Sequence, residues 1–372
     1  MAKVTVIGAG NAGYALACHL SLNGHKVALF EHPNFKEAIE PVKKEGCLIA
    51  SAEEDGYKAA VSGTGKIDLA TTEIGEAVKF GDVLVLVVPA FGQIPMFELM
   101  LPHLRDGHII VSMPGNYVSL EFARIMEEKG AKQDVAFVDT NSIPYACRKL
   151  KEPANGVFIS GIKLGLTTGV YPADKTDQIF EKLKGIIPGN HYKANNVLEA
   201  GFTNPNIIFH PPPTLLNVGW IEVTGGNFKF YTEGASPSIC RVMESVDKER
   251  MAIATVLGLQ TPDIVEIFKQ CYGETGYPGL YDSLHTSAHY RYFKAPPSLS
   301  GRYIAEDLCF NLIPIAELGK KRGVPTPTID TLVHLASVMT GEQMAAKRSL
   351  SFVCKEGESK EQMHQRLAKG KL

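Results

Sequence analysis

Residues 4–13 read Val-Thr-Val-Ile-Gly-Ala-Gly-Asn-Ala-Gly, and this stretch decides the fold. A short β-branched run ends in a G-x-G-x-x-G motif, and a helical pattern over residues 11–22 follows at once. Three glycines by themselves indicate little more than a turn. A strand, a glycine-rich turn and a helix in immediate succession are the signature of a dinucleotide-binding loop.

Each glycine of the motif has its own physical task. Gly8 allows the tight turn, Gly10 lets the backbone approach a pyrophosphate, and Gly13 lets the helix lie close to the strand. The phosphates would then lie at the positive end of the helix, where Asn11 and Ala12 complete the predicted contacts. The motif therefore predicts a nicotinamide dinucleotide as cofactor.

From this loop to about residue 140, short β-branched runs alternate with helical patterns joined by glycine or proline. This alternation is typical of a parallel sheet with helices on both faces. Four of the five runs are almost entirely apolar, as strands covered on both faces are. We predict an α/β, Rossmann-type, doubly wound parallel sheet whose strands cover residues 4–7, 26–31, 83–88, 108–113 and 135–139.

The regions around this sheet are less regular. A polar segment at residues 47–72 suggests small inserted strands before a helix at 74–80. Beyond residue 140 the strand signals weaken, so we place a dinucleotide-binding domain at residues 1–190 and a mainly helical substrate and catalytic domain at 191–372. Further strands that would extend the sheet, and a last helix of the first domain, are expected at residues 157–159, 163–167 and 175–187.

The second half has helical periodicity. Its C-terminal residues 355–372 are highly charged and indicate a solvated tail or a surface helix. Helices are expected at residues 196–209, 247–257, 262–272, 302–322 and 327–339.

Composition narrows the class of protein. The 372 residues include 38 Lys and Arg against 40 Asp and Glu, a formal charge of −2 with no basic block, which disfavours nucleic acid as a partner. Seven scattered cysteines without a C-x-x-C pair disfavour a disulfide framework or zinc site and favour a cytoplasmic location. The N-terminal residues lack the pattern of a signal sequence and no apolar stretch reaches the ~18 residues of a membrane span, so we expect neither feature.

Glu31, at the end of the second expected strand, bears on the choice of cofactor. A carboxylate there accepts hydrogen bonds from both adenosine ribose hydroxyls and repels a 2′-phosphate, which favours NAD over NADP. The neighbouring His32 and Lys36 leave NADP possible. Pro89 and Ala90 end another strand at the ligand-binding edge of the sheet, where they either approach the nicotinamide or simply form a turn.

A polar stripe in the second half points to a second part of the site. Within the apolar residues 197–217, five polar residues recur at spacings of 3 or 4, so that a continuous helix would place them on one face. The stripe consists of Thr203, Asn206, His210, Thr214 and Asn217. Pro211 disfavours helical backbone in the residue before it, so we expect His210 at a kink or junction between two helices.

His210 can exchange a proton near neutral pH, although a lone histidine is also often a satisfied core residue. A catalytic histidine needs a carboxylate to orient it, and Asp307 lies in an apolar helical run where a carboxylate is more often paired than solvated. Arg302 opens the same helix and could instead form a surface pair with Glu306. No set of residues has the spacing of metal ligands, and His285 and His289 lack a third ligand.

The chain resembles the opine dehydrogenase family, which includes octopine, nopaline and carboxyethyl-norvaline dehydrogenases. The resemblance covers roughly residues 3–350 and rests on six motifs in the family's order. These are VIGAGNAG at 6–13, VVPA at 87–90, DTNSIPYACR at 139–148, TNPNIIFHPPPTLLN at 203–217, GRYIAEDL at 301–308 and VPTPTID at 324–330.

The resemblance implies an NAD(P)H-dependent enzyme that condenses an amino acid's amine with an α-keto acid, often pyruvate, through an imine. It places the family's catalytic histidine on His210, its partner aspartate on Asp307 and its carboxylate-binding arginine on Arg302. Thr140 and Cys147 would face the amino acid.

Asn206 would hydrogen-bond to the substrate or the cofactor. Asp139 stands where the family commonly has Glu, which leaves the amino acid open. The partners implied are small molecules, with a homodimer possible. Two alternatives remain open, a 2-keto-acid or ketopantoate-type reductase and a catalytically silent dinucleotide-sensing protein.

Overall fold

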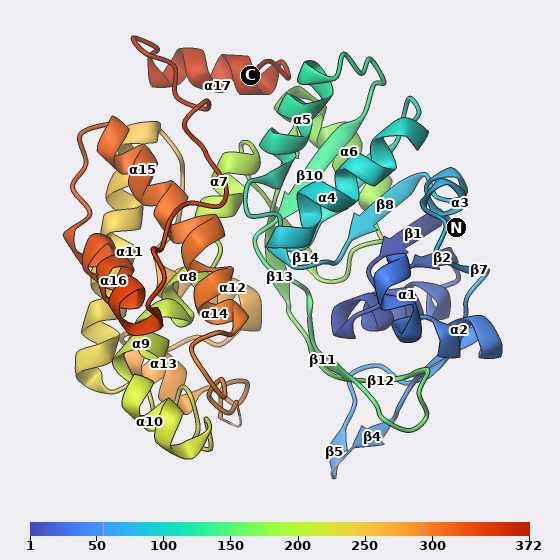
Figure 1. Cartoon of the computed structure of the whole chain (residues 1–372), viewed down its shortest axis with the longest axis horizontal. Coiled ribbons are helices and arrows are strands. Elements are labelled where there is room, and N and C mark those ends of the chain that lie inside the picture. The colour runs from blue at the N-terminus through green and yellow to red at the C-terminus, as the bar shows by residue number, and fades with distance from the viewer. Residues whose placement is uncertain (55, 292) are drawn as a thin grey trace. The chain divides into compact units, whose positions relative to one another are not determined.

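The computed structural model describes residues 1–54, 56–291 and 293–372. Within them the chain forms two compact units (Figure 1). The first comprises Met1–Val197 together with Ala368–Gly370, and the second comprises Leu198–Leu367 together with Lys371–Leu372. The first unit contains the sheets, and the second is helical.

The main sheet of the first unit has eight strands in the order β14-β13-β10-β9-β8-β1-β2-β7. All neighbours run parallel except β13, which is antiparallel to β10. This is the predicted Rossmann-type sheet, and its five central strands lie within two residues of the predicted runs. The strands are β1 (Lys3–Ile7), β2 (Lys26–Phe30), β7 (Leu69–Thr71), β8 (Val83–Leu86), β9 (Ile109–Ser112), β10 (Ala136–Thr140), β13 (Gly165–Tyr171) and β14 (Asn190–Lys193).

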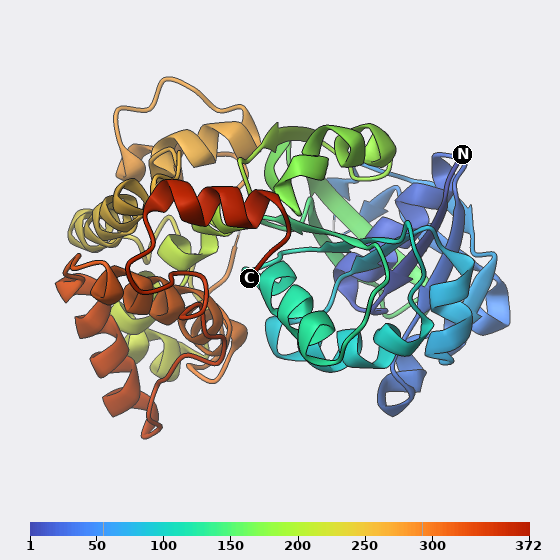
Figure 2. The ribbon, with the colours of Figure 1, turned by 90° about the horizontal axis from the view of Figure 1, so that it is seen from above.

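Alternation of side chains along the strands explains why both faces of this sheet are covered. Val4 and Val6 of β1 lie in one core cluster with apolar residues of α1 and α6. Between them Thr5 points the other way and donates a hydrogen bond to a carbonyl of α3. Figure 2 shows α6 and the pair α4–α5 on opposite sides of the main sheet.

The helical segments of the first unit connect these strands. The predicted helix at residues 74–80 is present as α3. The α-helices are α1 (Asn11–Leu22), α2 (Glu40–Glu45), α3 (Ile74–Phe80), α4 (Ala90–Met100), α5 (Val118–Glu128) and α6 (Thr176–Leu183), and the 3-10 turns are η1 (Pro33–Ala38), η2 (Leu101–His103) and η3 (Ala173–Lys175).

A second sheet, of four strands in the order β11-β12-β3-β6, packs against α1. The expectation that residues 157–159 extend the main sheet is wrong, because they lie in β12, which pairs with β11 and β3 here. An apolar run identifies a strand but not its partner. The strands are β3 (Cys47–Ala50), β6 (Gly63–Lys66), β11 (Tyr145–Lys149) and β12 (Gly156–Ile162), and a separate hairpin joins β4 (Glu53–Glu54) to β5 (Tyr57–Lys58).

Helices build the second unit, and two of them are more broken than the periodicity predicts. Residues 196–209 divide into α7 and α8, and residues 302–322 divide into α14, the π-helical turn η4 and α15. The helices are α7 (Val197–Phe202), α8 (Asn206–Phe209), α9 (Pro211–Leu216), α10 (Val218–Thr224), α11 (Pro237–Leu257), α12 (Ile264–Tyr272), α13 (Leu280–Thr286), α14 (Arg302–Ala305), η4 (Leu308–Leu312), α15 (Ile313–Lys321), α16 (Pro327–Thr340) and α17 (Lys360–Ala368).

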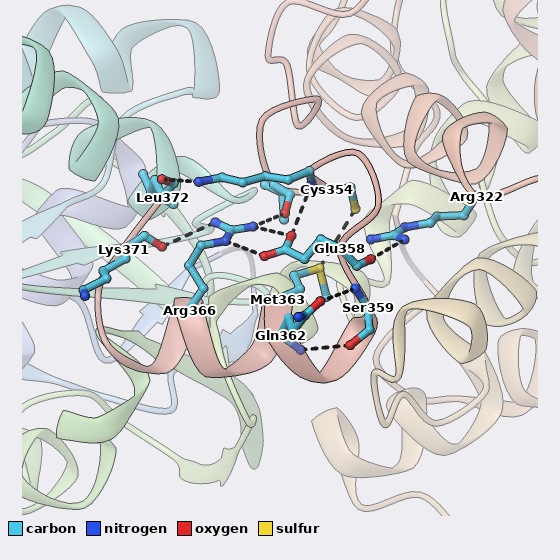
Figure 3. A network of polar contacts seen from close by, with 11 residues as sticks. Arg322, Cys354, Glu358, Ser359, Gln362, Met363, Arg366, Lys371 and Leu372 are labelled. Atoms are coloured by element: carbon cyan, nitrogen blue, oxygen red, sulfur yellow. Dashed lines mark hydrogen bonds and ion pairs between the residues drawn. The ribbon is translucent and has the colours of Figure 1, made fainter.

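The C-terminal helix α17 is docked rather than free. Its Met363 and Leu367 are fully buried. Arg366 donates hydrogen bonds to both carboxylate oxygens of Glu358, at 2.7 and 2.8 Å, and to the carbonyl of Val353 at 2.7 Å (Figure 3). Of the two alternatives, the surface helix is therefore the one that forms.

Two further observations concern the environment of the protein. None of the helices in the described part of the chain is both long and apolar enough to span a membrane. All seven cysteines are free thiols, and five of them are buried.

Candidate active site

The glycine loop between β1 and α1 has the shape that a dinucleotide needs. Gly8 has φ +108°, and a Cβ there would lie 2.8 Å from the carbonyl oxygen of Val87. A Cβ on Gly13 would lie 1.8 Å from the carbonyl oxygen of Gly8, so only glycine lets α1 approach the strand this closely. Gly10 has no atom within 4 Å of its Cβ position. The backbone is thus closely packed at Gly8 and Gly13, whereas no other atom lies near the Cβ position of Gly10.

The start of α1 is suited to an anion. Gly10 is the N-cap and supplies no side-chain hydrogen bond, and the first turn contains no acidic residue. The unpaired N–H groups and the helix dipole therefore favour a phosphate at this end. Asn11 and Ala12 are the first two residues of α1, and the Asn11 Oδ1 accepts a hydrogen bond of 3.0 Å from the backbone N–H of Lys149.

Glu31 is fixed in position beside this loop. One carboxylate oxygen accepts the N–H of Ala9 at 2.7 Å and the other accepts the N–H of His32 at 2.8 Å. These bonds orient the carboxylate at the carboxyl end of β2, where the ribose of a bound dinucleotide lies in this fold. The residues present fit an adenine dinucleotide.

Two turns follow strands β8 and β9 at the carboxyl edge of the main sheet. Pro89 is the N-cap of α4 and Ala90 is its first residue, directly after β8. At the end of β9, a Cβ on Gly115 would lie 2.1 Å from the Asp139 side chain, so this position must be glycine. Asn116 then has the left-handed φ of 51°. Strained backbone of this kind clusters at ligand sites.

Thr140 and Cys147 both lie in the first unit but in different sheets. Thr140 ends β10 and is buried, and its hydroxyl donates a hydrogen bond of 2.8 Å to the carbonyl of Ser142. Cys147 is half-buried in β11, at a register shift against β12.

His210 and Asp307 form a hydrogen-bonded pair in the second unit. The His210 Nδ1 lies 2.6 Å from the Asp307 Oδ2, and both side chains are less than a tenth exposed, at 8% and 7%. An ionised carboxylate can only accept, so it holds the hydrogen on Nδ1 and leaves proton exchange with a substrate to Nε2. This is the histidine–carboxylate arrangement that general acid–base catalysis uses.

The local sequence explains how His210 comes to this position. His210 is both the C-cap of α8 and the N-cap of α9, so it lies at the junction of two helices, as Pro211 predicts. The preceding Phe209 is buried and packs edge to face against Tyr231, Phe268 and Tyr290, with ring centroids 5.7–6.3 Å apart. The aromatic cluster thereby anchors the junction that carries the imidazole.

Asp307 is positioned by an irregular helix. It lies between α14 and η4, and its carbonyl accepts a hydrogen bond of 3.1 Å from the N–H of Leu312, five residues on. Such π-helical turns are frequent at functional sites. The helix α14 packs against α9, and η4 packs against α8, which brings the two junction residues together.

Tyr303 is a site residue that the sequence did not single out. Its ring stacks on the His210 imidazole with centroids 3.7 Å apart and an angle of 11° between the planes. Burial raises the pKa of Tyr303, while the Arg302 guanidinium opposes this shift and the Asp307 carboxylate adds to it. A signal existed, because Tyr303 precedes Asp307 by one helical turn in the same motif.

Arg302 and the polar stripe complete the second unit's candidates. Arg302 is exposed at the start of α14, and Asn206 is partly exposed at the start of α8. Thr203 donates to a backbone carbonyl within α7 and Asn217 to two carbonyls, so these residues serve the fold. Thr214 is fully buried, and its hydroxyl has no hydrogen-bond partner in the part of the chain that the structure describes.

The predicted residues thus form two groups. The glycine loop, Glu31, Pro89, Ala90, Thr140 and Cys147 belong to the first unit, and Asn206, His210, Arg302 and Asp307 to the second. Among the described residues, no three His, Cys, Asp or Glu side chains gather as metal ligands would.

Known proteins share both halves of this arrangement. Residues 193–340 match the family described as NAD/NADP octopine/nopaline dehydrogenase, alpha-helical domain, and residues 3–128 match the N-terminus of NAD-dependent glycerol-3-phosphate dehydrogenase. An opine dehydrogenase from Arthrobacter sp. (strain 1C) is 34% identical over 333 residues, which cover 89% of each chain.

Solved structures of an octopine dehydrogenase and of a ketopantoate reductase have a similar fold. A structure of octopine dehydrogenase in complex with NADH and agmatine has a TM-score of 0.75 at 21% identity, covering 100% of this chain and 95% of that one. A ketopantoate reductase from Ralstonia eutropha JMP134 has a TM-score of 0.58 at 17% identity, covering 92% and 99%. The helical-domain match and the 34% identity over most of both chains show that this protein belongs to the opine dehydrogenase family.

Proposed function

We propose that this protein condenses the amine of an amino acid with an α-keto acid such as pyruvate and reduces the resulting imine, with His210 as general acid and base. Membership of the family makes it an NAD(P)-dependent oxidoreductase acting on CH–NH groups. The observation that carries the catalytic assignment is the buried His210–Asp307 pair at 2.6 Å, covered by the Tyr303 ring.

The reaction needs protons moved at two atoms. Imine formation releases the keto-acid oxygen as water, so His210 protonates that oxygen and accepts a proton from the amine nitrogen through Nε2. Asp307 holds the Nδ1 hydrogen and stabilises the imidazolium while it exists. When bound, the nicotinamide would supply hydride to the imine carbon, and the imine nitrogen takes a proton from Nε2 of His210.

The remaining predicted residues have binding roles. Arg302 would hold the keto-acid carboxylate by a bidentate contact, for which a guanidinium is well shaped. Asn206, one helical turn before His210, would hydrogen-bond to the substrate or to the cofactor amide. Thr140 and Cys147 would lie on the amino-acid side.

The fixed Glu31 carboxylate favours NADH over NADPH, because it accepts ribose hydroxyls and repels a 2′-phosphate. We also expect a homodimer in the cytoplasm. Seven free thiols accord with a reducing compartment, and light scattering on the purified protein measures the assembly state.

NADH oxidation with pyruvate across a panel of amino acids tests the reaction, and His210→Gln tests the assignment. We expect the variant to lose at least about a hundredfold in kcat, the usual contribution of a general acid–base group. Asp307→Asn should lose a similar factor, because an amide no longer fixes the imidazole as a carboxylate does. His334→Gln, at an exposed histidine of α16, is the matched control and should retain full activity.

The assay also separates the alternatives. Turnover of a keto acid without any amine would identify a ketopantoate-type reductase, and NADH binding without turnover of any pair would identify a sensing protein. Unchanged turnover in His210→Gln would refute the role of His210.

A further inference from the structure

Lys149, the last residue of β11, reaches the glycine loop from a strand far along the chain. Its ammonium donates hydrogen bonds to the carbonyl of Ala9 at 3.2 Å and to the carbonyl of Ala38 at 3.1 Å. The same ammonium lies 3.7 Å from the centroid of the Tyr14 ring. Its backbone N–H donates to Asn11 at 3.0 Å. One residue thus contacts the loop, the first turns of α1 and the segment after β2.

These contacts hold the peptide groups around Ala9 from two sides. The N–H of Ala9 donates to the Glu31 carboxylate at 2.7 Å, while its carbonyl accepts from Lys149. Ala9 lies between Gly8 and Gly10, whose backbone would otherwise turn freely. An acidic and a basic side chain therefore fix the orientation of the loop that receives the pyrophosphate.

Lys149 also joins the loop to the segment that follows Glu31. Ala38 ends the turn η1, and its carbonyl accepts a second hydrogen bond, of 2.6 Å, from the Tyr14 hydroxyl. The glycine loop faces the phosphates and the carboxyl end of β2 faces the adenosine ribose in this fold. The parts that Lys149 connects are those that surround the adenosine half of the cofactor.

An ammonium in this place has to be explained by more than packing. Half-burial deprives it of water, which lowers the pKa of Lys149, while the Glu31 carboxylate opposes the shift. A neutral side chain would fill the same space without this cost. The two carbonyls, the ring face and the nearby carboxylate all favour a positive charge.

We propose that Lys149 is a positioning residue for the cofactor, which uses its charge to hold the glycine loop and the adenosine side of the pocket in the binding conformation. The inference concerns binding alone and needs no turnover. Its failure and the failure of the proposed reaction can therefore be told apart.

The test is the dissociation constant of NADH for the full-length protein and its variants, measured by calorimetry. Lys149→Met, similar in length but uncharged, should weaken NADH about tenfold. Lys149→Arg should recover most of that loss, because it retains charge and donors. Lys151→Met, at an exposed lysine two residues on, is the control and should bind NADH as the wild type does.

AMP and nicotinamide mononucleotide locate the effect. Lys149→Met should weaken AMP by a similar factor and leave nicotinamide mononucleotide unchanged. NADH binding within twofold of wild type in Lys149→Met would overturn the proposal. Equal losses in the Met and Arg variants would overturn it as well, since size rather than charge would then matter.

If Lys149→Met does not fold, a pH series on the wild type and on Lys149→Arg tests the proposal instead. As the pH rises, the NADH affinity of the wild type should begin to fall below the usual lysine pKa of 10.5, since burial lowers the pKa of Lys149. Lys149→Arg should stay flat, because arginine keeps its charge. A parallel fall in both proteins would contradict the proposal.

The titratable groups around Lys149 do not confuse this comparison. Tyr14 on α1 contacts the ammonium and Glu31 after β2 acts on its charge, while Lys36 and Glu37 precede Ala38 in the chain. Burial, with a smaller contribution from Glu31, raises the pKa of Tyr14 to about 12, so its phenol stays neutral. The arginine variant retains all of these groups, and only the residue at position 149 differs.

Discussion

Tyr303 covers one face of the His210 ring, and the stack keeps the imidazole in the plane in which Asp307 meets it. In the proposed mechanism, the face of the phenol would also attract the imidazolium. We expect Tyr303→Phe to retain nearly full kcat, because the ring remains, and Tyr303→Leu to lose about tenfold, the value of a buried aromatic contact. Steady-state kinetics measure both, with thermal unfolding to confirm that each variant is folded. A Leu variant as active as the Phe variant would show that stacking does not matter.

At the same scale, the sequence pairs His210 with Asp307, and the structure has the two side chains 2.6 Å apart. Their catalytic roles stay a prediction. Tyr303 was open to prediction, because it lies one helical turn before Asp307 in the same motif. Lys149 was not, because a contact between residues 149 and 9 depends on folding and leaves no periodic pattern.

Helix α11 stabilises the segment that leads to His210. Arg250 is fully buried and pairs with Asp247 at 2.6 Å. It also donates to the carbonyls of Phe202 at 2.9 Å and Pro262 at 2.7 Å, at the end of α7 and before α12. Arg250→Met should lower the free energy of unfolding by about 3–5 kcal/mol, because it leaves the Asp247 charge buried.

Urea denaturation checks this value. Arg241→Met is the matched control, since Arg241 lies exposed on the same helix, and it should change stability by less than about 0.5 kcal/mol. A loss as small in Arg250→Met as in the control would contradict the role given to α11.

Among the elements, those with a strong local signal were predictable. The strands around β1 and the helices α3, α12 and α16 follow from apolar runs and periodicity. Helix α11 extends ten residues further toward the N-terminus than periodicity indicated, from Ser236 as its cap. The break between α8 and α9 follows from Pro211, whereas η4 has no proline at its start. Its π-helical turn packs against α8, and Pro314, two residues after its end, cannot donate the backbone hydrogen bond of a regular helix.

For the molecule as a whole, the C-terminal helix contributes stability that depends on pH. Hydrogen bonds from Arg366 lower the pKa of Glu358 below its usual 4.5. A carboxylate with a lowered pKa in the folded state stabilises the protein above pH 4.5, and this contribution is lost as the pH falls through the folded value. Arg366→Gln should therefore lower the free energy of unfolding by about 1 kcal/mol at neutral pH and by progressively less in acid.

Unfolding by urea at a series of pH values measures the difference between this variant and the wild type. Lys369→Gln, at an exposed lysine of the same segment, should show no such difference. If Arg366→Gln lowered the free energy of unfolding by the same amount at neutral pH and well below pH 4.5, the ion pair with Glu358 would not be the source of the loss.

The order of the strands along the chain also determines when the sheets can fold during synthesis on the ribosome. Every strand of both sheets precedes residue 194, so the sheets can close as soon as that stretch has left the exit tunnel. Residues 368–370 join this unit last. A nascent chain would hence hold a nucleotide-binding half while His210 is still inside the tunnel and Asp307 is not yet translated. NADH, which binds the folded half, would then act as a folding ligand for it before the His210–Asp307 pair can form.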